Sequence, residues 1–316
     1  MRDAAKDSII FDMKFTEQKT VNSAVSCSGV GLHSGKYITL TIKPAGANMG
    51  FVFVRTDVKS DESKIEAHFG NVIRTNLGTV IANKFGVEVS TIEHLMAALY
   101  GCGVDNAIIE VNGPEIPIMD GSSAPFIQMI DRVGVKELGA YRRIIRIKDE
   151  VKVGDENKWA ILRPGKGFKV KVDIDFADKA IAHQVAKFDF KANTFREELA
   201  DARTFCMKRE VDAMYAAGLA KGGSLENAIV VHDGKVLNQG GLRYEDEFVR
   251  HKILDAVGDL FLIGGHIQGE FVGVHSGHKL NNEILRTLID NPTAWELITP
   301  EAPSSRQLRA ASFIFA

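Results

Sequence analysis

The sequence predicts an α+β fold of two domains, each with a sheet layered against helices, on three observations. Its 316 residues are more than a single hydrophobic core usually serves. Segments in which apolar and polar residues alternate, as in strands, are followed by segments with the helical spacing of apolar residues. This order restarts near residue 139, so we expect an N-terminal domain over 1–138 and a C-terminal domain over 139–316, with residues 1–14 as a loose extension.

The N-terminal domain is expected to begin with short strands. Residues 37–44 alternate apolar and polar side chains and end at Pro44, as a half-buried strand does. The full set of expected elements comprises strands at 20–21, 23–27, 37–44, 51–55, 78–82 and 104–111, and helices at 90–101 and 124–133. The loop 29–35 carries His33 among glycines, and polar side chains in such loops often meet ligands, although a plain loop histidine is the simpler reading.

The helix expected at 90–101 leaves two interpretations open for its acidic residue. Ser90 and Glu93 fit the S-x-x-E capping box, in which each side chain bonds a free backbone amide. However, Glu93 directly precedes His94 on an otherwise apolar helix. A glutamate beside a ligand histidine is what a zinc hydrolase uses to deprotonate water, and a carboxylate engaged in a cap would be a poor base.

The C-terminal domain repeats the order of strands followed by helices. Strands are expected at 142–147, 151–153, 159–162, 168–172 and 269–274, and helices at 248–262 and 281–289. A strand–helix–strand insert is expected near 205–231. His278 follows the last of these strands in a loop beside Gly277, where it is available to a site.

Three of the ionisable residues in the helix at 248–262 stand out against its apolar background. His251, Asp255 and Asp259 are spaced four apart, which stacks them along one face of the helix. Burying such a row is costly unless a metal or another partner compensates, and a histidine and a carboxylate one turn apart can share a cation. This face is therefore half of a zinc site or, alternatively, an ordinary His–Asp pair with Asp259 solvated.

The composition excludes several classes of protein. With 39 Lys and Arg against 41 Asp and Glu, the chain has no excess positive charge for binding nucleic acid. Cys27, Cys102 and Cys206 form no C-x-x-C pair, so a reducing, cytoplasmic location is expected. No run of about 18 apolar residues occurs, so we expect no stable membrane insertion.

A series of motifs covers nearly the whole chain in order. They are Gly29–Gly35, Ser90–Leu95, Met119–Ser122, Asp201–Phe205, Asn227–Val230, Phe248–Asp259 and Ser276–Asn282. Together they resemble the bacterial zinc deacetylases that act on UDP-3-O-acyl-N-acetylglucosamine in the committed step of lipid A biosynthesis. The resemblance implies that His94 of the first domain and His251 and Asp255 of the second hold one Zn²⁺ per chain in an active site in the cleft between the domains, with a fourth position open as in catalytic zinc sites.

The same resemblance implies the catalytic roles. Glu93 corresponds to the general base, and His278 to the general acid that protonates the leaving amine, with Asp259 orienting its ring. Thr204 and Lys252 correspond to groups that stabilise the oxyanion. Lys252 points away from the ligand face of the helix, so a surface lysine that extends to solvent is its alternative reading.

The resemblance also implies the substrate, a UDP-linked acylated amino sugar. Phe205 and Met207 would contact the acyl chain, and His33 would lie near the nucleotide. The family usually has Thr-Phe-Gly-Phe where this chain has Thr-Phe-Cys206-Met207, which bears on acyl-length preference. We expect a monomer with no nucleic-acid partner and at most transient contact with a membrane.

Two other functions stay open on the sequence. One is a zinc amidohydrolase acting on a different N-acetyl sugar or peptide. The other is a noncatalytic lipid- or nucleotide-sugar-binding module in which the histidines and aspartates form a structural metal site.

Overall fold

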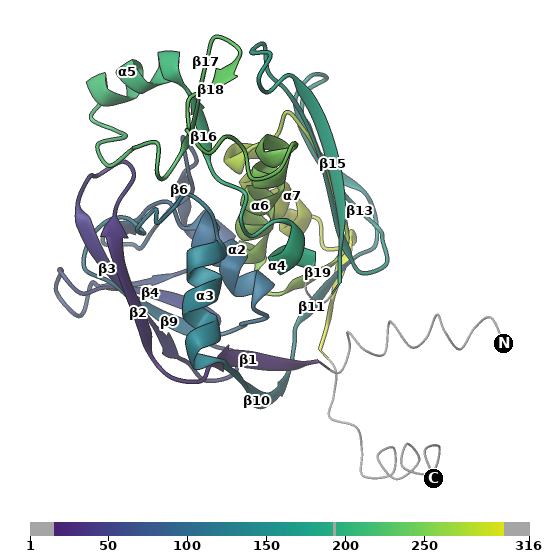
Figure 1. Ribbon diagram of the computed structural model, residues 1–316. Coiled ribbons are helices and arrows are strands. Elements are labelled where there is room, and N and C mark those ends of the chain that lie inside the picture. The colour runs from purple at the N-terminus through teal and green to yellow at the C-terminus, as the bar shows by residue number, and fades with distance from the viewer. Residues whose placement is uncertain (1–15, 192–193, 300–316) are drawn as a thin grey trace, which may run out of the picture.

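The computed structural model describes residues 16–191 and 194–299, and these form an α+β fold with several sheets and six α-helices (Figure 1). The fold class predicted from the sequence is thereby confirmed. The expectation for residues 1–14 lies outside the described residues. None of the helices in the described part of the chain is both long enough and apolar enough to cross a membrane.

A five-stranded sheet carries the core of the N-terminal half. In spatial order its strands are β2 (Val25–Val30), β3 (Tyr37–Pro44), β9 (Ala107–Val111), β4 (Phe51–Arg55) and β5 (Lys64–Glu66). Neighbouring strands are antiparallel except β4 and β9, which run parallel. Ile38, Leu40 and Ile42 of β3 are at most 1% exposed, as the alternation in the sequence predicts.

Two smaller sheets complete this half. One contains β6 (Val72–Arg74), β7 (Val80–Ala82) and β8 (Glu88–Val89), and the other pairs β1 (Glu17–Val21) with β10 (Val135–Tyr141). Strand β10 runs across residue 139, where the sequence predicts a domain boundary. The position of that boundary stays a prediction.

A seven-stranded sheet forms the C-terminal half. Its main path is β12 (Val151–Gly154), β13 (Trp159–Arg163), β19 (His266–Val274), β11 (Ile144–Ile147) and β20 (Trp295–Ile298), with β14 (Phe168–Asp175) joining β19 to β15 (His183–Phe190). Strand β15 was not predicted, because most of its residues are exposed or half-buried and only Phe188 is buried. Such an edge strand lacks the strong apolar alternation that marks a strand in the sequence.

The helices lie between and beside the two large sheets (Figure 1). They are α2 (Glu93–Gly101), α3 (Ala124–Val133), α4 (Thr194–Glu198), α5 (Lys208–Ala216), α6 (Glu247–Leu260) and α7 (His278–Asp290). Helix α2 packs against α6, and α6 packs in turn against β14 and α7. One helix of each half therefore meets the other in the interior.

The predicted insert near 205–231 is present as a strand, a helix and a strand. Strand β16 (Phe205–Met207) leads into α5 and pairs in parallel with β17 (Ile229–His232), which β18 (Lys235–Val236) extends. In Figure 1 these elements lie together at one end of the molecule, beyond the ends of α2 and α6.

Two predicted helix starts are wrong. Helix α2 begins at Glu93 with no side-chain cap, and the Ser90 hydroxyl instead donates to the Pro114 carbonyl oxygen at 3.1 Å. The capping box predicted for Ser90 and Glu93 therefore does not form. Helix α7 begins at His278, three residues before the predicted start, so His278 is its first residue and not part of a loop.

Candidate metal centre and active site

Three ionisable residues of α6 are buried along one face of that helix. His251, Asp255 and Asp259 are 1%, 3% and 3% exposed. The alternative in which Asp259 is solvated is therefore wrong. Groups of this kind are stable in an interior only when other charges, donors or a metal compensate for the lost water.

Helices α2 and α6 make their close contact at Gly258 of α6. A Cβ atom on Gly258 would lie 2.1 Å from the backbone oxygen of Glu93 and 3.2 Å from the backbone nitrogen of Ala97, so any larger residue would separate the helices. This close approach brings His94 beside His251, with ring centroids 4.9 Å apart. Residues far apart in the sequence thus share one site.

His94, His251 and Asp255 form a cluster that could hold a metal ion. Their ligand atoms lie within 4.8 Å of one another, and all three residues are buried. Asp255 Oδ1 lies 3.5 Å from His94 Nε2 and 3.3 Å from His251 Nε2. This oxygen is buried without a hydrogen-bond partner among the described residues, as a metal ligand's oxygen would be before the metal is added.

The protonation of these groups suits metal binding. His251 Nδ1 lies 2.9 Å from the Ala202 carbonyl oxygen, so a proton on Nδ1 leaves the Nε2 lone pair facing the cluster. Burial lowers the pKa of His251 to about 3, which keeps the ring neutral. Burial acts to raise the pKa of Asp255, but the charge of Lys252, which donates to its Oδ2, and the other polar groups nearby outweigh burial and hold that pKa well below its ordinary value.

Glu93 is buried beside the cluster. It is 3% exposed, and its Oε2 accepts a hydrogen bond from the Thr79 backbone N–H at 2.9 Å. Burial raises the pKa of Glu93, although the nearby His278 and His94 side chains act to lower it. A carboxylate with a raised pKa accepts a proton more readily, which suits a general base.

The His278 ring forms a hydrogen bond with the carboxylate of Asp259. His278 Nδ1 lies 2.8 Å from Asp259 Oδ2, so Nδ1 donates to the carboxylate. Burial acts to lower the pKa of His278, but the Asp259 carboxylate, with Glu93 and Asp255 nearby, outweighs it and raises the pKa to about 9. The ring therefore carries a proton near neutral pH, as a general acid must.

Lys252 turns toward the cluster and not toward solvent. Its Nζ donates to Asp255 Oδ2 at 3.0 Å and lies 5.5 Å from the centroid of the Phe205 ring. The alternative reading of a surface lysine is wrong. Thr204 lines the same cavity, where its backbone N–H donates to the Gly121 carbonyl oxygen at 2.8 Å.

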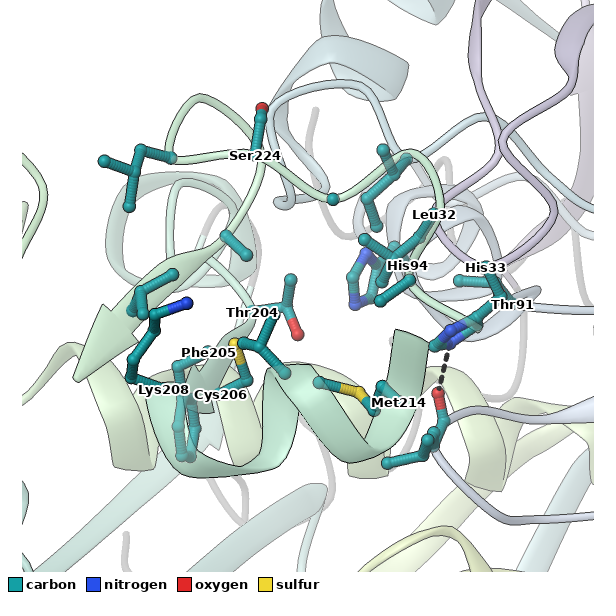
Figure 2. Close-up of a pocket in the computed structure, with 18 of the residues that line it drawn as sticks. Leu32, His33, Thr91, His94, Thr204, Phe205, Cys206, Lys208, Met214 and Ser224 are labelled. Atoms are coloured by element: carbon teal, nitrogen blue, oxygen red, sulfur yellow. Dashed lines mark hydrogen bonds between the residues drawn. The ribbon is translucent and has the colours of Figure 1, made fainter. Parts of the chain in front are cut away.

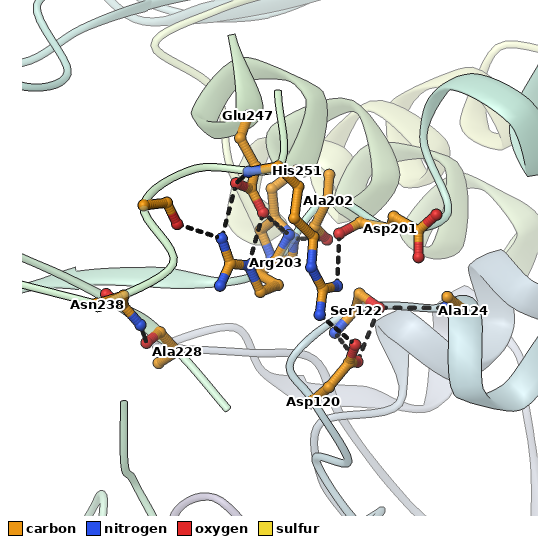
Figure 3. A network of polar contacts seen from close by, with 12 residues as sticks. Asp120, Ser122, Ala124, Asp201, Ala202, Arg203, Ala228, Asn238, Glu247 and His251 are labelled. Atoms are coloured by element: carbon orange, nitrogen blue, oxygen red, sulfur yellow. Dashed lines mark hydrogen bonds and ion pairs between the residues drawn. The ribbon is translucent and has the colours of Figure 1, made fainter. Parts of the chain in front are cut away.

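A buried ion pair fixes the segment that leads to Thr204 (Figure 3). Glu247 is 0% exposed, and its Oε1 accepts from Arg203 Nε at 2.8 Å and from the Arg203 backbone N–H at 3.0 Å. This pair holds the chain next to Ala202, whose carbonyl oxygen bonds His251. Glu247 is not among the site residues predicted from the sequence, although its partner Arg203 lies inside one of the family motifs.

An apolar cavity of about 510 Å³ adjoins these groups. Its lining includes Glu93, His94, Thr204, Lys252, Asp255 and His278. Apolar residues supply much of the remaining wall, among them Phe205, Val211, Met214, Leu225, Val230 and Leu237. Figure 2 shows His94, Thr204 and Phe205 around this space, with Cys206 and Met214 contributed by the insert.

Two of the three predicted substrate-binding residues line the cavity. Phe205 and His33 do so, and His33 Nε2 lies 3.1 Å from the Leu77 carbonyl oxygen. Met207 is 4% exposed and packs in the core, whereas its neighbour Cys206 lines the cavity. Cys206 and Met207 are adjacent in β16, so their side chains point to opposite faces of the strand. Phe205 shares the face of Met207, but its ring lies beside Lys252 Nζ at the cavity wall.

The comparison with known proteins agrees with this arrangement. The LpxC family model, described as UDP-3-O-acyl N-acetylglycosamine deacetylase, matches residues 18–290. The chain is 50% identical over 282 residues to the UDP-3-O-acyl-N-acetylglucosamine deacetylase of Phenylobacterium zucineum (strain HLK1), an alignment covering 89% of this chain and 96% of that relative. It is 48% identical over 300 residues to the protein of the same name from Shewanella woodyi, covering 93% and 98%. Because the match spans most of the sequence and includes both helices that form the cluster, this chain belongs to the UDP-3-O-acyl N-acetylglycosamine deacetylase family.

Proposed function

We propose that this chain hydrolyses the N-acetyl group of UDP-3-O-((3R)-3-hydroxyacyl)-N-acetylglucosamine in a zinc-dependent reaction that releases acetate and the free amine. Its family catalyses the committed step of lipid A biosynthesis. The proposal depends above all on one observation, the buried His–His–Asp cluster that adjoins a glutamate, a histidine and an apolar cavity.

The donor set supports zinc as the metal. Two imidazoles and one carboxylate are common ligands of catalytic zinc and leave a fourth position open. His94, His251 and Asp255 would hold the ion, and the buried, unpartnered Oδ1 of Asp255 fits a ligand oxygen. When bound, zinc would lower the pKa of water and polarise the amide carbonyl.

Glu93 would act as the general base and His278 as the general acid. Glu93, with one oxygen fixed by the Thr79 N–H, takes a proton from the attacking water. His278 donates its Nε2 proton to the leaving nitrogen, since Nδ1 is engaged with Asp259. The hydroxide formed in this way adds to the carbonyl carbon, the C–N bond breaks as its nitrogen takes the proton of His278, and the products are acetate and the free amine.

Thr204 and Lys252 would stabilise the oxygen that gains charge during the attack. The Lys252 ammonium is fixed between Asp255 and the face of Phe205, so it enters the reaction already oriented. Burial acts to lower the pKa of Lys252, but Asp255 outweighs it and raises that pKa, so the side chain stays charged. A preorganised donor of this kind is worth about 100-fold or more in rate.

The apolar cavity supports an acylated substrate. Its walls match the hydrocarbon chain of the proposed substrate, whereas a small acetylated sugar or peptide would leave them in contact with water. We further propose that His33 contacts the nucleotide part. The chain would act as a cytoplasmic monomer, with at most transient membrane contact when it collects its substrate.

The test is acetate release from the acylated UDP-sugar by zinc-loaded protein. We expect turnover by the wild type and losses of about 100-fold or more in Glu93→Gln and in His278→Ala, with zinc content unchanged. Glu110→Gln serves as the matched control, because Glu110 lies in β9 and pairs with Lys43 away from the cavity.

Two outcomes would contradict the proposal. If the wild type bound the substrate without releasing acetate, the chain would be a binding module with a structural metal. If it deacetylated a soluble acetylamino sugar as fast as the acylated nucleotide, the cavity would have no role in selecting the substrate.

A further inference from the structure

Thr79 contacts both halves of the proton-transfer machinery. It is 2% exposed and lies between β6 and β7, next to the start of β7. Its backbone N–H donates to Glu93 Oε2 at 2.9 Å, and its hydroxyl donates to Asp259 Oδ1 at 2.5 Å. One residue thus bonds the proposed base and the carboxylate that holds the proposed acid.

The hydrogen bonds of Asp259 divide unequally between its two oxygens. Oδ2 accepts from His278 Nδ1 at 2.8 Å and from Asn281 Nδ2 at 2.9 Å. Oδ1 accepts from Thr79 alone among the residues that the structure describes. Without that hydroxyl the carboxylate would be held only through Oδ2 and could turn more easily about its Cβ–Cγ bond, which would loosen the orientation that it gives to the imidazole.

The backbone before Thr79 is held in an uncommon conformation. Leu77 has φ of 59° and Gly78 has φ of 146°, both on the positive side that residues other than glycine rarely adopt. The Leu77 carbonyl oxygen lies 3.1 Å from His33 Nε2, which ties this turn to the loop beside the cavity. Such a conformation persists only where the surroundings impose it, and here it aims Thr79 at two acidic groups.

We propose that Thr79 is a positioning residue for the deacetylation, one that fixes the acid relative to the base by holding Glu93 through its backbone and Asp259 through its hydroxyl. This inference rests on the proposed function, because it takes Glu93 as the base and His278 as the acid. Thr79 touches neither the substrate nor the metal ligands in this account. Its effect reaches the reaction through the orientation of the His278 ring.

The kinetic test compares Thr79→Val, which keeps the shape and removes the hydroxyl, with Thr79→Ser, which keeps the hydroxyl. We expect Thr79→Val to lower kcat by about 10- to 100-fold, as partners that orient catalytic groups commonly do. KM and zinc content should change by less than about twofold, because ground-state binding is untouched. Thr79→Ser should retain most of the wild-type kcat.

A matched control separates positioning from simple destabilisation. Thr20 is 0% exposed, and its hydroxyl accepts a hydrogen bond from the Ala45 N–H at 3.0 Å, far from the cavity. Thr20→Val should therefore lower the melting temperature but leave kcat unchanged. If Thr79→Val behaved like Thr20→Val, with kcat intact, the proposal would be wrong.

Two further measurements show whether Thr79 acts through Asp259. In an Asp259→Ala background, Thr79→Val should cost almost nothing more in kcat, because the acceptor is gone. The proton resonance of His278 Nδ1–H, assigned by its loss in His278→Ala, should move in Thr79→Val and stay in place in Thr20→Val. Additive losses in kcat, or an unmoved resonance, would overturn the proposal.

These readouts separate failure of this inference from failure of the proposed function. If Glu93→Gln and His278→Ala kept their rates, the proposed function would fail, while the resonance would still decide whether Thr79 orients His278. If those variants lost their rates and Thr79→Val did not, the proposed function would stand and only the role of Thr79 would be rejected.

Discussion

At the scale of single residues, the Lys252 side chain points into the site although its helix position predicts that it points away. Lys252 follows the proposed ligand His251 in sequence and therefore points away from it on an ideal helix. Its long side chain nevertheless reaches back to Asp255 and lies over Phe205. The position on the helix fixes the Cα atom of such a side chain, whereas neighbouring charges determine the position of its ammonium group.

Replacing Lys252 tests the value of that ammonium. We expect Lys252→Met to lower kcat by about 100-fold, because the developing oxyanion loses a fixed positive charge. KM should change little. Lys279→Met is the control, since Lys279 on α7 has a side chain that is 76% exposed. Steady-state kinetics gives kcat and KM, and the zinc content of each variant is measured alongside. An unchanged kcat would show that Lys252 does not stabilise the oxyanion.

At the scale of elements, the site depends on how closely α2 approaches α6. Gly258 lies on α6 opposite the first turn of α2, where a side chain would collide with the Glu93 carbonyl oxygen. The contact belongs to the backbone of both helices, so it cannot be relieved by a change of rotamer. The packing of two helices therefore sets the distance of His94 from His251 and Asp255 on α6.

We expect Gly258→Ala to damage stability and catalysis together. Overpacking of a tight contact commonly costs about 1–3 kcal/mol, and moving α2 also displaces Glu93 and His94. Urea denaturation and acetate release would be measured on the same samples. Gly240→Ala is the control, because a Cβ atom there meets nothing within 4 Å. Equal behaviour of the two variants would show that the helix contact is not limiting.

Features that depend on local sequence spacing could be predicted, whereas features that depend on contacts between distant residues could not. The face formed by His251, Asp255 and Asp259 was predictable, because it depends only on spacing within one helix. Of the two interpretations left open for Glu93, the capping one is wrong, because its carboxylate accepts the Thr79 N–H instead. The hydrogen bond from Thr79 to Asp259 joins residues 180 apart in sequence, so no local sequence pattern predicts it.

At the scale of the whole molecule, a second polar cluster joins the two halves. Asp105 accepts hydrogen bonds from Arg142 Nε at 3.0 Å and from the Lys19 backbone N–H at 2.8 Å, and His266 Nε2 lies 2.7 Å from its other oxygen. The Asp105 side chain is 10% exposed. Because its partners come from both ends of the described chain, this carboxylate ties the N-terminal half to the C-terminal half.

This cluster predicts a dependence of stability on pH. Burial acts to raise the pKa of Asp105, but the His266 hydrogen bond and the Arg142 charge outweigh it and lower that pKa below its ordinary value of 3.8. A carboxyl with a lowered folded pKa stabilises the fold above its unfolded pKa and loses this effect as the pH falls through the folded value. Asp105→Asn should therefore melt below the wild type at pH 7, and the gap should narrow below about pH 4.

Calorimetry across pH measures this gap. Asp61→Asn, at an exposed position, is the control and should follow the wild type throughout. A gap for Asp105→Asn that stayed constant down to pH 2 would show that the charge of Asp105 does not contribute to the free energy of unfolding.

The separation of His94 from His251 and Asp255 along the chain also has a consequence for protein synthesis. A ribosome releases the residues of α2 long before those of α6, and domains generally fold in the order in which they emerge. A nascent chain that stops short of α6 carries the proposed base and one proposed ligand but has no cluster. Binding of the proposed zinc therefore has to follow the synthesis of α6, and incomplete translation products should have no hydrolytic activity.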